Sequence, residues 1–294
     1  MPRPRFARLG LSLGSIKPSI RPVRTPCRSL FTVPPIENLE KMVNGIPEFL
    51  SPAAVDMAWT QYQGYMIERL NNLVAGGQWQ NADVKQIAIN YARDPNSAPI
   101  FNYASMAHNN HFFFEALQSH KVPIPQSLKT DLEKDFSSIE TLQREMIVTA
   151  SSMFGPGFVW LVHGSVGNTG KRGFRILTTY LAGSPYSGAH TRRQATDMNT
   201  ESNAMGSSVA RGPPANAVGA HGNHSKAPGP TVAPGGIDVQ PVLCLNTWEH
   251  VYLPDYGVAG KMAYASCWWE RVNWSLVARR LGKTEFNQPS KFQI

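Results

Sequence analysis

The stretch Asn246-Thr247-Trp248-Glu249-His250-Val251-Tyr252 brings an acid, an imidazole and two aromatic rings together within a single short segment. Two earlier segments of the 294-residue chain have a similar character, with histidine or tryptophan beside large apolar groups. They are His108-Asn109-Asn110-His111-Phe112-Phe113-Phe114 and Gly155-Pro156-Gly157-Phe158-Val159-Trp160-Leu161-Val162. The elements predicted around these three segments indicate the fold class.

Before Gly155 the apolar residues recur with the spacing of amphipathic helices. A first helix is predicted to begin at Ser51-Pro52, an N-cap followed by proline at the first helical position, and to end at Gly76-Gly77. A second helix is predicted over 101–117, and a long third helix over 128–153 with charged residues opposite its apolar face. We expect two of these helices to form a hairpin.

After Gly155 the pattern changes to short apolar runs typical of strands, over 158–162, 174–180 and 239–245. Residues 183–236 consist mainly of Gly, Ala, Ser, Pro and Asn, and such a composition predicts a long, flexible surface insertion because it buries little apolar surface. A closing helix is predicted over 259–281. Helices first, strands next and a helix last indicate an α+β fold.

The positive charge is concentrated at the N-terminus. Residues 1–36 hold seven of the 28 basic side chains and no acidic one, which leaves 21 basic against 20 acidic residues in the rest of the chain. An arginine-rich, serine-containing and acid-free start is typical of a mitochondrial transit peptide, which we assign to residues 1–30. A basic arm that contacts nucleic acid directly is the alternative. The nearly neutral remainder gives no electrostatic reason to expect nucleic-acid binding.

Composition excludes several other classes of protein. The chain contains no run of about 18 consecutive apolar residues, so a conventional membrane span is not expected. Its cysteines form no CxxC pair for zinc and are too few to cross-link a chain of this length; they are Cys27, Cys244 and Cys267. A reducing intracellular compartment is expected, and together with the transit peptide this indicates the mitochondrial matrix.

In their order and spacing, the three segments resemble those of the iron/manganese superoxide dismutases. The resemblance covers roughly residues 47–278 and includes Asp255-Tyr256 and Val272-Asn273-Trp274. It implies an N-terminal helical hairpin domain over 31–120, followed by a C-terminal α/β domain with a small antiparallel sheet. That second domain would span 121–294 and contain the insertion at about 183–236.

Members of that family hold one metal ion with three histidines and one aspartate, and this chain matches only part of the set. His111 and His250 match two of the histidines, whereas Asn246 stands at the aspartate position and Ala58 at the position of the first histidine. Two neutral imidazoles lack both the number of ligands and the anion that would stabilise an oxidised metal ion. The departures from the family pattern therefore predict no metal cofactor and no dismutase activity.

Other positions of the family site are also altered. The resemblance places Tyr62 where a further histidine is expected, and Met66, beside Tyr65, at a gateway tyrosine. His108 lies three residues before His111, so the two could share another metal on one helix face. We favour a core hydrogen bond for His111 and a surface or outer position for His108. The pair His221 and His224 lies in the insertion and is interpreted as incidental.

Two short basic clusters are candidates for contacts with RNA or protein, and a solvated turn or helix end is the alternative for each. Their candidate contact residues are Lys171, Arg172, Arg175, Arg279, Arg280 and Lys283. The resemblance also implies a dimer interface, because the glutamate of the Trp-Glu-His segment in dismutases reaches across a two-fold axis to the partner's ligand histidine. Glu249 and His250 would then lie at that interface, with a pairing inside the same chain as the alternative.

A mitochondrial chain with this fold and a lost metal site resembles the dismutase-like proteins of the fungal mitochondrial small ribosomal subunit. Two such paralogues are thought to form a heterodimer there. This resemblance implies a non-catalytic structural constituent of that subunit, with mitochondrial ribosomal proteins, a paralogue and ribosomal RNA as partners. Two alternatives stay open: a matrix superoxide dismutase with an atypical ligand set, and a free-standing mitochondrial binding module.

Overall fold

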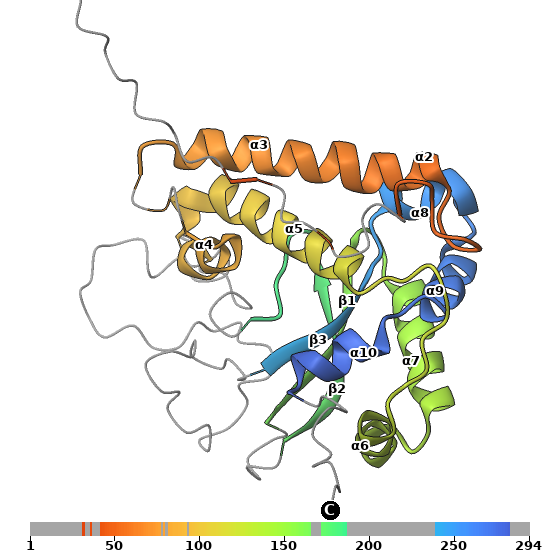
Figure 1. Ribbon diagram of the computed structural model, residues 1–294. Coiled ribbons are helices and arrows are strands. Elements are labelled where there is room, and N and C mark those ends of the chain that lie inside the picture. Colours follow the sequence, from red (N-terminus) through yellow and green to blue (C-terminus); the bar gives the residue numbers. More distant parts are fainter. Residues whose placement is uncertain are drawn as a thin grey trace, which may run out of the picture.

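The computed structural model describes residues 31–32, 36, 42–77, 79, 82–92, 94–165, 172–186 and 239–282. The predicted transit peptide and most of the predicted insertion lie outside these ranges. Figure 1 shows two long helices, α3 and α5, lying above a small sheet, with α6, α7, α8 and α9 on one side of the sheet and α4 on the other.

The first predicted helix begins and ends where the sequence indicates, but it is not uniform. It comprises α2 (Pro52–Val55), a π-helical turn η1 (Asp56–Gln61) and α3 (Tyr62–Val74). The Ser51 hydroxyl accepts a hydrogen bond from the backbone N–H of Ala54, as expected for an N-cap. The π-helical turn contains Ala58, the position that the resemblance matches to the first ligand histidine.

The second predicted helix is α5 (Ala98–Glu115), which packs along α3 and confirms the predicted hairpin. Between the two lie α4 (Val84–Tyr91) and the 3₁₀ turn η2 (Pro95–Ser97). The sequence analysis did not predict α4.

The three predicted strands form one antiparallel sheet in the order β2-β1-β3, which confirms the α+β fold. The strands are β1 (Gly157–Ser165), β2 (Arg172–Tyr180) and β3 (Val239–Asn246). A Cβ atom on Gly157 would lie 2.2 Å from the Thr179 carbonyl oxygen, so only glycine allows β1 to start this close to β2. Figure 1 shows α5 between α3 and the sheet, and α5 contacts β3 directly.

Two long helices predicted from apolar spacing are each broken in the structure. The helix predicted over 128–153 is α6 (Gln126–Phe136) followed by α7 (Ile139–Ser152), separated at Ser137, whose φ is 67°. The helix predicted over 259–281 is α9 (Lys261–Trp269) followed by α10 (Trp274–Arg280). The break before α10 exists because the backbone there bonds to the end of α5: the N–H of Asn273 donates to the Ala116 carbonyl over 2.8 Å.

The predicted insertion begins later than residue 183. The described residues Gly183–Tyr186 belong to the packed body, since Asn109 of α5 donates to the Gly183 carbonyl over 2.9 Å and Tyr186 is buried. A further helix missed by the sequence analysis, α8 (Glu249–Tyr256), follows directly after β3.

A continuous apolar core joins the helical hairpin to the sheet and the C-terminal helices. Its buried members run from Ile36 to Ala278 and include Phe113 of α5, Trp160 of β1 and Trp268 of α9. The core therefore crosses the predicted domain boundary at residue 120. Within the described ranges, no helix has the length and hydrophobicity that crossing a membrane requires.

Candidate functional site

The four positions matched to metal ligands come from four different elements. Ala58 lies in η1 and is fully buried, and His111 lies in the last turn of α5. Asn246 is the last residue of β3, and His250 follows one turn later in α8. The fold thus brings the hairpin, the sheet and the C-terminal helices to the place where the resemblance predicts a site.

Side-chain amides occupy the centre of this region. Asn246 Nδ2 donates to Asn110 Oδ1 over 3.2 Å, and Asn110 Nδ2 donates over 3.0 Å to both Gln63 Oε1 and the Ala58 carbonyl. Gln63 Nε2 then donates to the Ala107 carbonyl over 2.8 Å. Gln63, Asn110 and Asn246 are all buried, and we call them the amide chain. Sequence reasoning considered Asn246 only as a lost ligand and missed Gln63 altogether.

The two retained histidines are half-buried and lie among aromatic rings. The His250 ring stacks on Tyr62 at a centroid distance of 4.0 Å, and the His111 ring lies 5.9 Å from that of Trp59. The Nε2 atom of each histidine is buried without a hydrogen-bond partner, so the core hydrogen bond expected for His111 is absent at that atom. Burial lowers the pKa of His250 to about 4 and also lowers the pKa of His111. Both rings are neutral at pH 7.

This donor set does not fit the metal ion of the dismutases. Neither the Ala58 methyl nor the Asn246 amide supplies an anionic oxygen or an imidazole, and the Asn246 amide is already committed on both of its polar atoms. In the described part of the chain, no three His, Cys, Asp or Glu side chains converge in a way that could hold a metal ion. The two unpartnered imidazole nitrogens are too few for a redox-active site.

A pocket of about 590 Å³ opens beside this region. Its lining includes Tyr62, Met66 and Trp248, so the two residues at altered family positions do face a common space. Burial raises the pKa of Tyr62 to about 12, which keeps its phenol protonated at neutral pH. Tyr62 therefore presents a neutral hydroxyl and an aromatic face where the family has a histidine.

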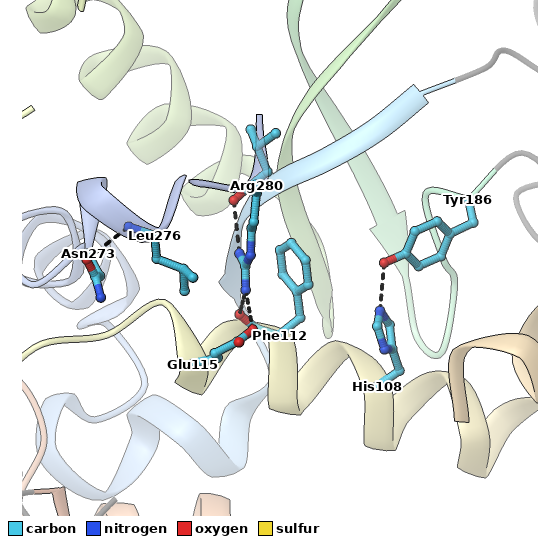
Figure 2. A network of polar contacts seen from close by, with 8 residues as sticks. His108, Phe112, Glu115, Tyr186, Asn273, Leu276 and Arg280 are labelled. Atoms are coloured by element: carbon cyan, nitrogen blue, oxygen red, sulfur yellow. Dashed lines mark hydrogen bonds and ion pairs between the residues drawn. The ribbon is translucent and has the colours of Figure 1, made fainter. Parts of the chain in front are cut away.

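His108 is half-buried, which rules out the surface position but not the outer position expected as its alternative. Its Nε2 lies 2.7 Å from the Tyr186 hydroxyl, and burial lowers the pKa of His108 to about 3. Figure 2 shows this contact between α5 and the segment that follows β2. The imidazole is thus a structural hydrogen-bond partner and is separate from the ligand positions.

The basic cluster around α10 divides into one exposed and one internal residue. The Arg280 guanidinium lies 3.5 Å from the centre of the Phe112 ring and donates to Glu115 Oε2 over 2.6 Å and to the Val242 carbonyl over 2.9 Å. Figure 2 shows this side chain enclosed between α5 and β3. Arg280 therefore stabilises the chain internally and is removed from the possible RNA contacts, whereas Arg279 is exposed.

The other cluster lies on an edge strand. Arg172 is exposed and Arg175 is half-buried on β2, at the edge of the sheet opposite β3. Lys171 and Lys283 lie outside the described residues, as do His221 and His224.

Glu249 lies at the start of α8 and interacts electrostatically with Lys261 of α9; burial lowers the pKa of Lys261, and the Glu249 carboxylate offsets only part of that effect. Lys261 Nζ also donates to the Met153 carbonyl over 2.8 Å, which joins the start of α9 to the segment before β1. Three exposed apolar side chains neighbour these residues in sequence: Phe154 after Met153, 96% exposed, Val258 before α9, 89% exposed, and Met262 after Lys261, 55% exposed. We call them the Phe154 patch.

Comparison with known proteins agrees with this geometry. Residues 124–192 and 223–280 match the family of iron/manganese superoxide dismutases, C-terminal domain. The chain is similar to small ribosomal subunit protein mS43 of Schizosaccharomyces pombe, with 29% identity over 87% of this chain and 85% of the relative. It is also similar to mS42 of the same organism, with 28% identity over 67% of this chain and 73% of the relative.

Iron superoxide dismutases are similar at lower identity. The protein from Helicobacter pylori strain J99 is 23% identical over 79% of this chain and 81% of the relative. The predicted resemblance to the iron/manganese superoxide dismutases and to fungal small ribosomal subunit proteins is confirmed.

Proposed function

We propose that this superoxide dismutase-like protein is a structural constituent of the mitochondrial small ribosomal subunit and acts in the mitochondrial matrix. The similarity to mS43 over nearly the whole chain is the observation that carries the proposal. The altered ligand positions support it, since Ala58 and Asn246 leave no donor set for the chemistry of the dismutases. The protein then contributes its shape and its surfaces to the ribosome and catalyses no reaction.

The proposal is tested by sedimentation. A tagged full-length chain is expressed in the source cells, and a matrix extract is separated on a sucrose gradient at moderate salt with Mg²⁺. We expect the chain to migrate with the small-subunit RNA, and to remain with it after Mg²⁺ removal has separated the two subunits. A tagged soluble matrix enzyme serves as the control and stays at the top. Recovery of the chain with that control would contradict the ribosomal role.

Metal content and enzymatic activity of the same purified protein distinguish the ribosomal role from the dismutase alternative. We expect neither stoichiometric manganese or iron nor superoxide dismutation, because two neutral imidazoles give weak binding and a poor redox match. A full complement of metal with dismutation in the tagged chain would favour the atypical dismutase instead.

We further propose that a dismutase-like paralogue docks on the Phe154 patch and the adjoining start of α8. Isolated exposed apolar side chains are common, but a phenylalanine exposed over almost its entire surface is typical of a protein interface. Val258 and Met262 are also exposed, at the start of α9, which packs against α7. Glu249 is connected to this patch through Lys261, which bonds to the Met153 carbonyl, whereas the ring of the next residue, His250, stacks on Tyr62. A carboxylate there would pair with an imidazole of the paralogue across the interface.

Docking is tested with Phe154→Asp. A charge at the centre of an apolar contact leaves a desolvated carboxylate without a partner, so recovery of the paralogue with the tagged chain should fall about tenfold or more. Leu73→Asp is the matched control, since Leu73 is 40% exposed at the far end of α3. Equal recovery with both variants would exclude this surface as the interface.

Contacts with ribosomal RNA are proposed for the exposed arginines Arg172 and Arg279, with Arg175 as a half-buried neighbour on β2. Single phosphate contacts of this kind position a protein without reading sequence. Replacing Arg172 or Arg279 by Gln should weaken retention on the subunit mainly at raised salt, and unchanged salt dependence would count against the contact.

A further inference from the structure

We propose that the amide chain is a metal-independent cross-link that fixes the helical hairpin to the sheet. Its members belong to three elements that are distant in sequence: Gln63 in α3, Asn110 in α5 and Asn246 at the end of β3. The inference concerns the isolated chain and does not depend on whether the protein is ribosomal.

The hydrogen bonds of the amide chain run in one direction. Asn246 donates to Asn110, Asn110 donates to Gln63, and Gln63 donates to the Ala107 carbonyl. Each side-chain oxygen inside the chain accepts a bond, and each nitrogen donates at least one. This order requires a group at each position that can donate and accept at once, which a neutral amide does and a carboxylate does not.

The Asn246 end is anchored further. Its Oδ1 accepts from the backbone N–H of Trp248 over 2.9 Å, and its carbonyl accepts from the Tyr264 hydroxyl over 2.8 Å. Asn246 thereby links β3 to the segment before α8 and to α9. Since Asn246, Asn110 and Gln63 are at most 1% exposed, water does not compete for these bonds.

The amide chain and a metal centre exclude each other in this chain. An aspartate at position 246 would lose the donor to Asn110 Oδ1 and would place a charge beside that oxygen, at a fully buried position. With alanine at position 58, a metal ion would find no ligand at that position of η1 to offset this loss. The asparagine that removes the anionic ligand is therefore the same residue that completes the cross-link.

The first test compares purified wild-type protein with Asn246→Asp by thermal unfolding, in EDTA and in excess MnCl₂ or ferrous iron. We expect one melting temperature for the wild type in all three solutions. The variant should melt several degrees lower, and neither metal should restore it. A fall in the wild-type melting temperature in EDTA, or recovery of the variant with metal, would overturn the proposal.

The second test measures the energetic coupling between Gln63 and Asn246, and it remains informative when the variants are less stable than the wild type. Gln63→Leu and Asn246→Leu each remove one neighbour of Asn110, so the double variant should lose less melting temperature than the sum of the two single losses. The control pair is Gln63→Leu with Asn109→Leu, since the Asn109 amide bonds to Gly183 and Ser105. Losses in the control pair should add. Additive losses in the Gln63 and Asn246 pair would show that no cross-link runs through Asn110.

Discussion

Three half-buried histidines in this protein are held neutral by their surroundings. His108, His111 and His250 lie among aromatic rings, and burial is the main cause that lowers the pKa of each. In the unfolded chain their pKa values return to about 6.5. The folded state therefore binds fewer protons than the unfolded state below that pH, and protonation of these rings favours unfolding.

The pH dependence of stability follows from this sign. His108 has a folded pKa of about 3, so its contribution is complete above about pH 6.5 and is lost as the pH falls toward 3. We expect the free energy of unfolding of His108→Gln to be lower than that of wild type at pH 7.5. Between pH 6 and 4 the free energy of unfolding should fall less steeply in the variant than in the wild type. The two slopes should differ by up to about 1.4 kcal/mol per pH unit, the contribution of one titrating group. Urea unfolding across this range measures both slopes, and parallel curves would contradict the assignment.

Arg280 is the residue whose predicted and observed roles differ most. It was a candidate for RNA contact, yet its guanidinium binds Glu115 and two backbone carbonyls inside the chain. We expect Arg280→Met to lower the free energy of unfolding by about 2–3 kcal/mol, because two buried carbonyls and a partly buried carboxylate lose their donor. The exposed neighbour is the control: Arg279→Met should cost less than about 1 kcal/mol. Similar losses for the two variants in chemical denaturation would show that the internal hydrogen bonds of Arg280 add little to stability.

At the scale of elements, two adjacent serines form the break between α6 and α7, and they have opposite effects on stability. Ser137 has a φ of 67°, a value that residues other than glycine rarely adopt. Ser138 is the N-cap of α7, and its hydroxyl accepts from the Thr141 N–H over 3.1 Å. The first serine strains the connection, while the second stabilises the helix that follows.

Substitutions at these two positions should therefore have opposite signs. Ser137→Gly relieves the backbone strain and should raise the free energy of unfolding by about 0.5–1 kcal/mol. Ser138→Ala removes the cap and should lower it by about 1 kcal/mol. Thermal unfolding of the two variants beside wild type measures both shifts, and a shift of the same sign in both would refute this account of the turn.

The same turn shows why the sequence predicts some elements and not others. Apolar spacing over 128–153 continues through Ser137 without Gly or Pro, so periodicity alone predicts one helix where tertiary packing makes two. The break at 270–273 was missed for the same reason, since its cause is a backbone bond to Ala116, which is distant in sequence. The strands and the hairpin were predicted because their patterns are local.

Only those residues of the candidate site that belong to a sequence motif could be predicted. His111 and His250 could be located from their neighbours in sequence, and the substitutions at positions 58 and 246 could be noticed by comparison with the motif. The amide chain could not, because its bonds join residues 47 and 136 positions apart. Nothing in the composition around Gln63 distinguishes a buried amide from one on the surface of a helix.

At the scale of the whole molecule, the core does not divide at the predicted domain boundary. Most buried apolar side chains of the hairpin share one cluster with those of the sheet, from Ile36 to Ala278. A smaller second cluster lies within the hairpin, formed by Leu70, Val74, Ile87, Ala88 and Ala104. Polar links cross the same boundary, including the amide chain and the contacts of Arg280 with α5. Neither half can be removed without exposing apolar surface on the other.

A single cooperative unfolding transition is therefore expected, although larger chains often unfold in stages. Far-ultraviolet circular dichroism reports mainly the helices, and tryptophan fluorescence is weighted toward the sheet and the C-terminal helices, where Trp160, Trp248, Trp268, Trp269 and Trp274 lie. The two signals should change at the same urea concentration. The fragment 31–120 expressed alone should give no cooperative transition, because its half of the core is left uncovered. Two separated transitions, or a stably folded fragment, would show that the hairpin is an independent domain.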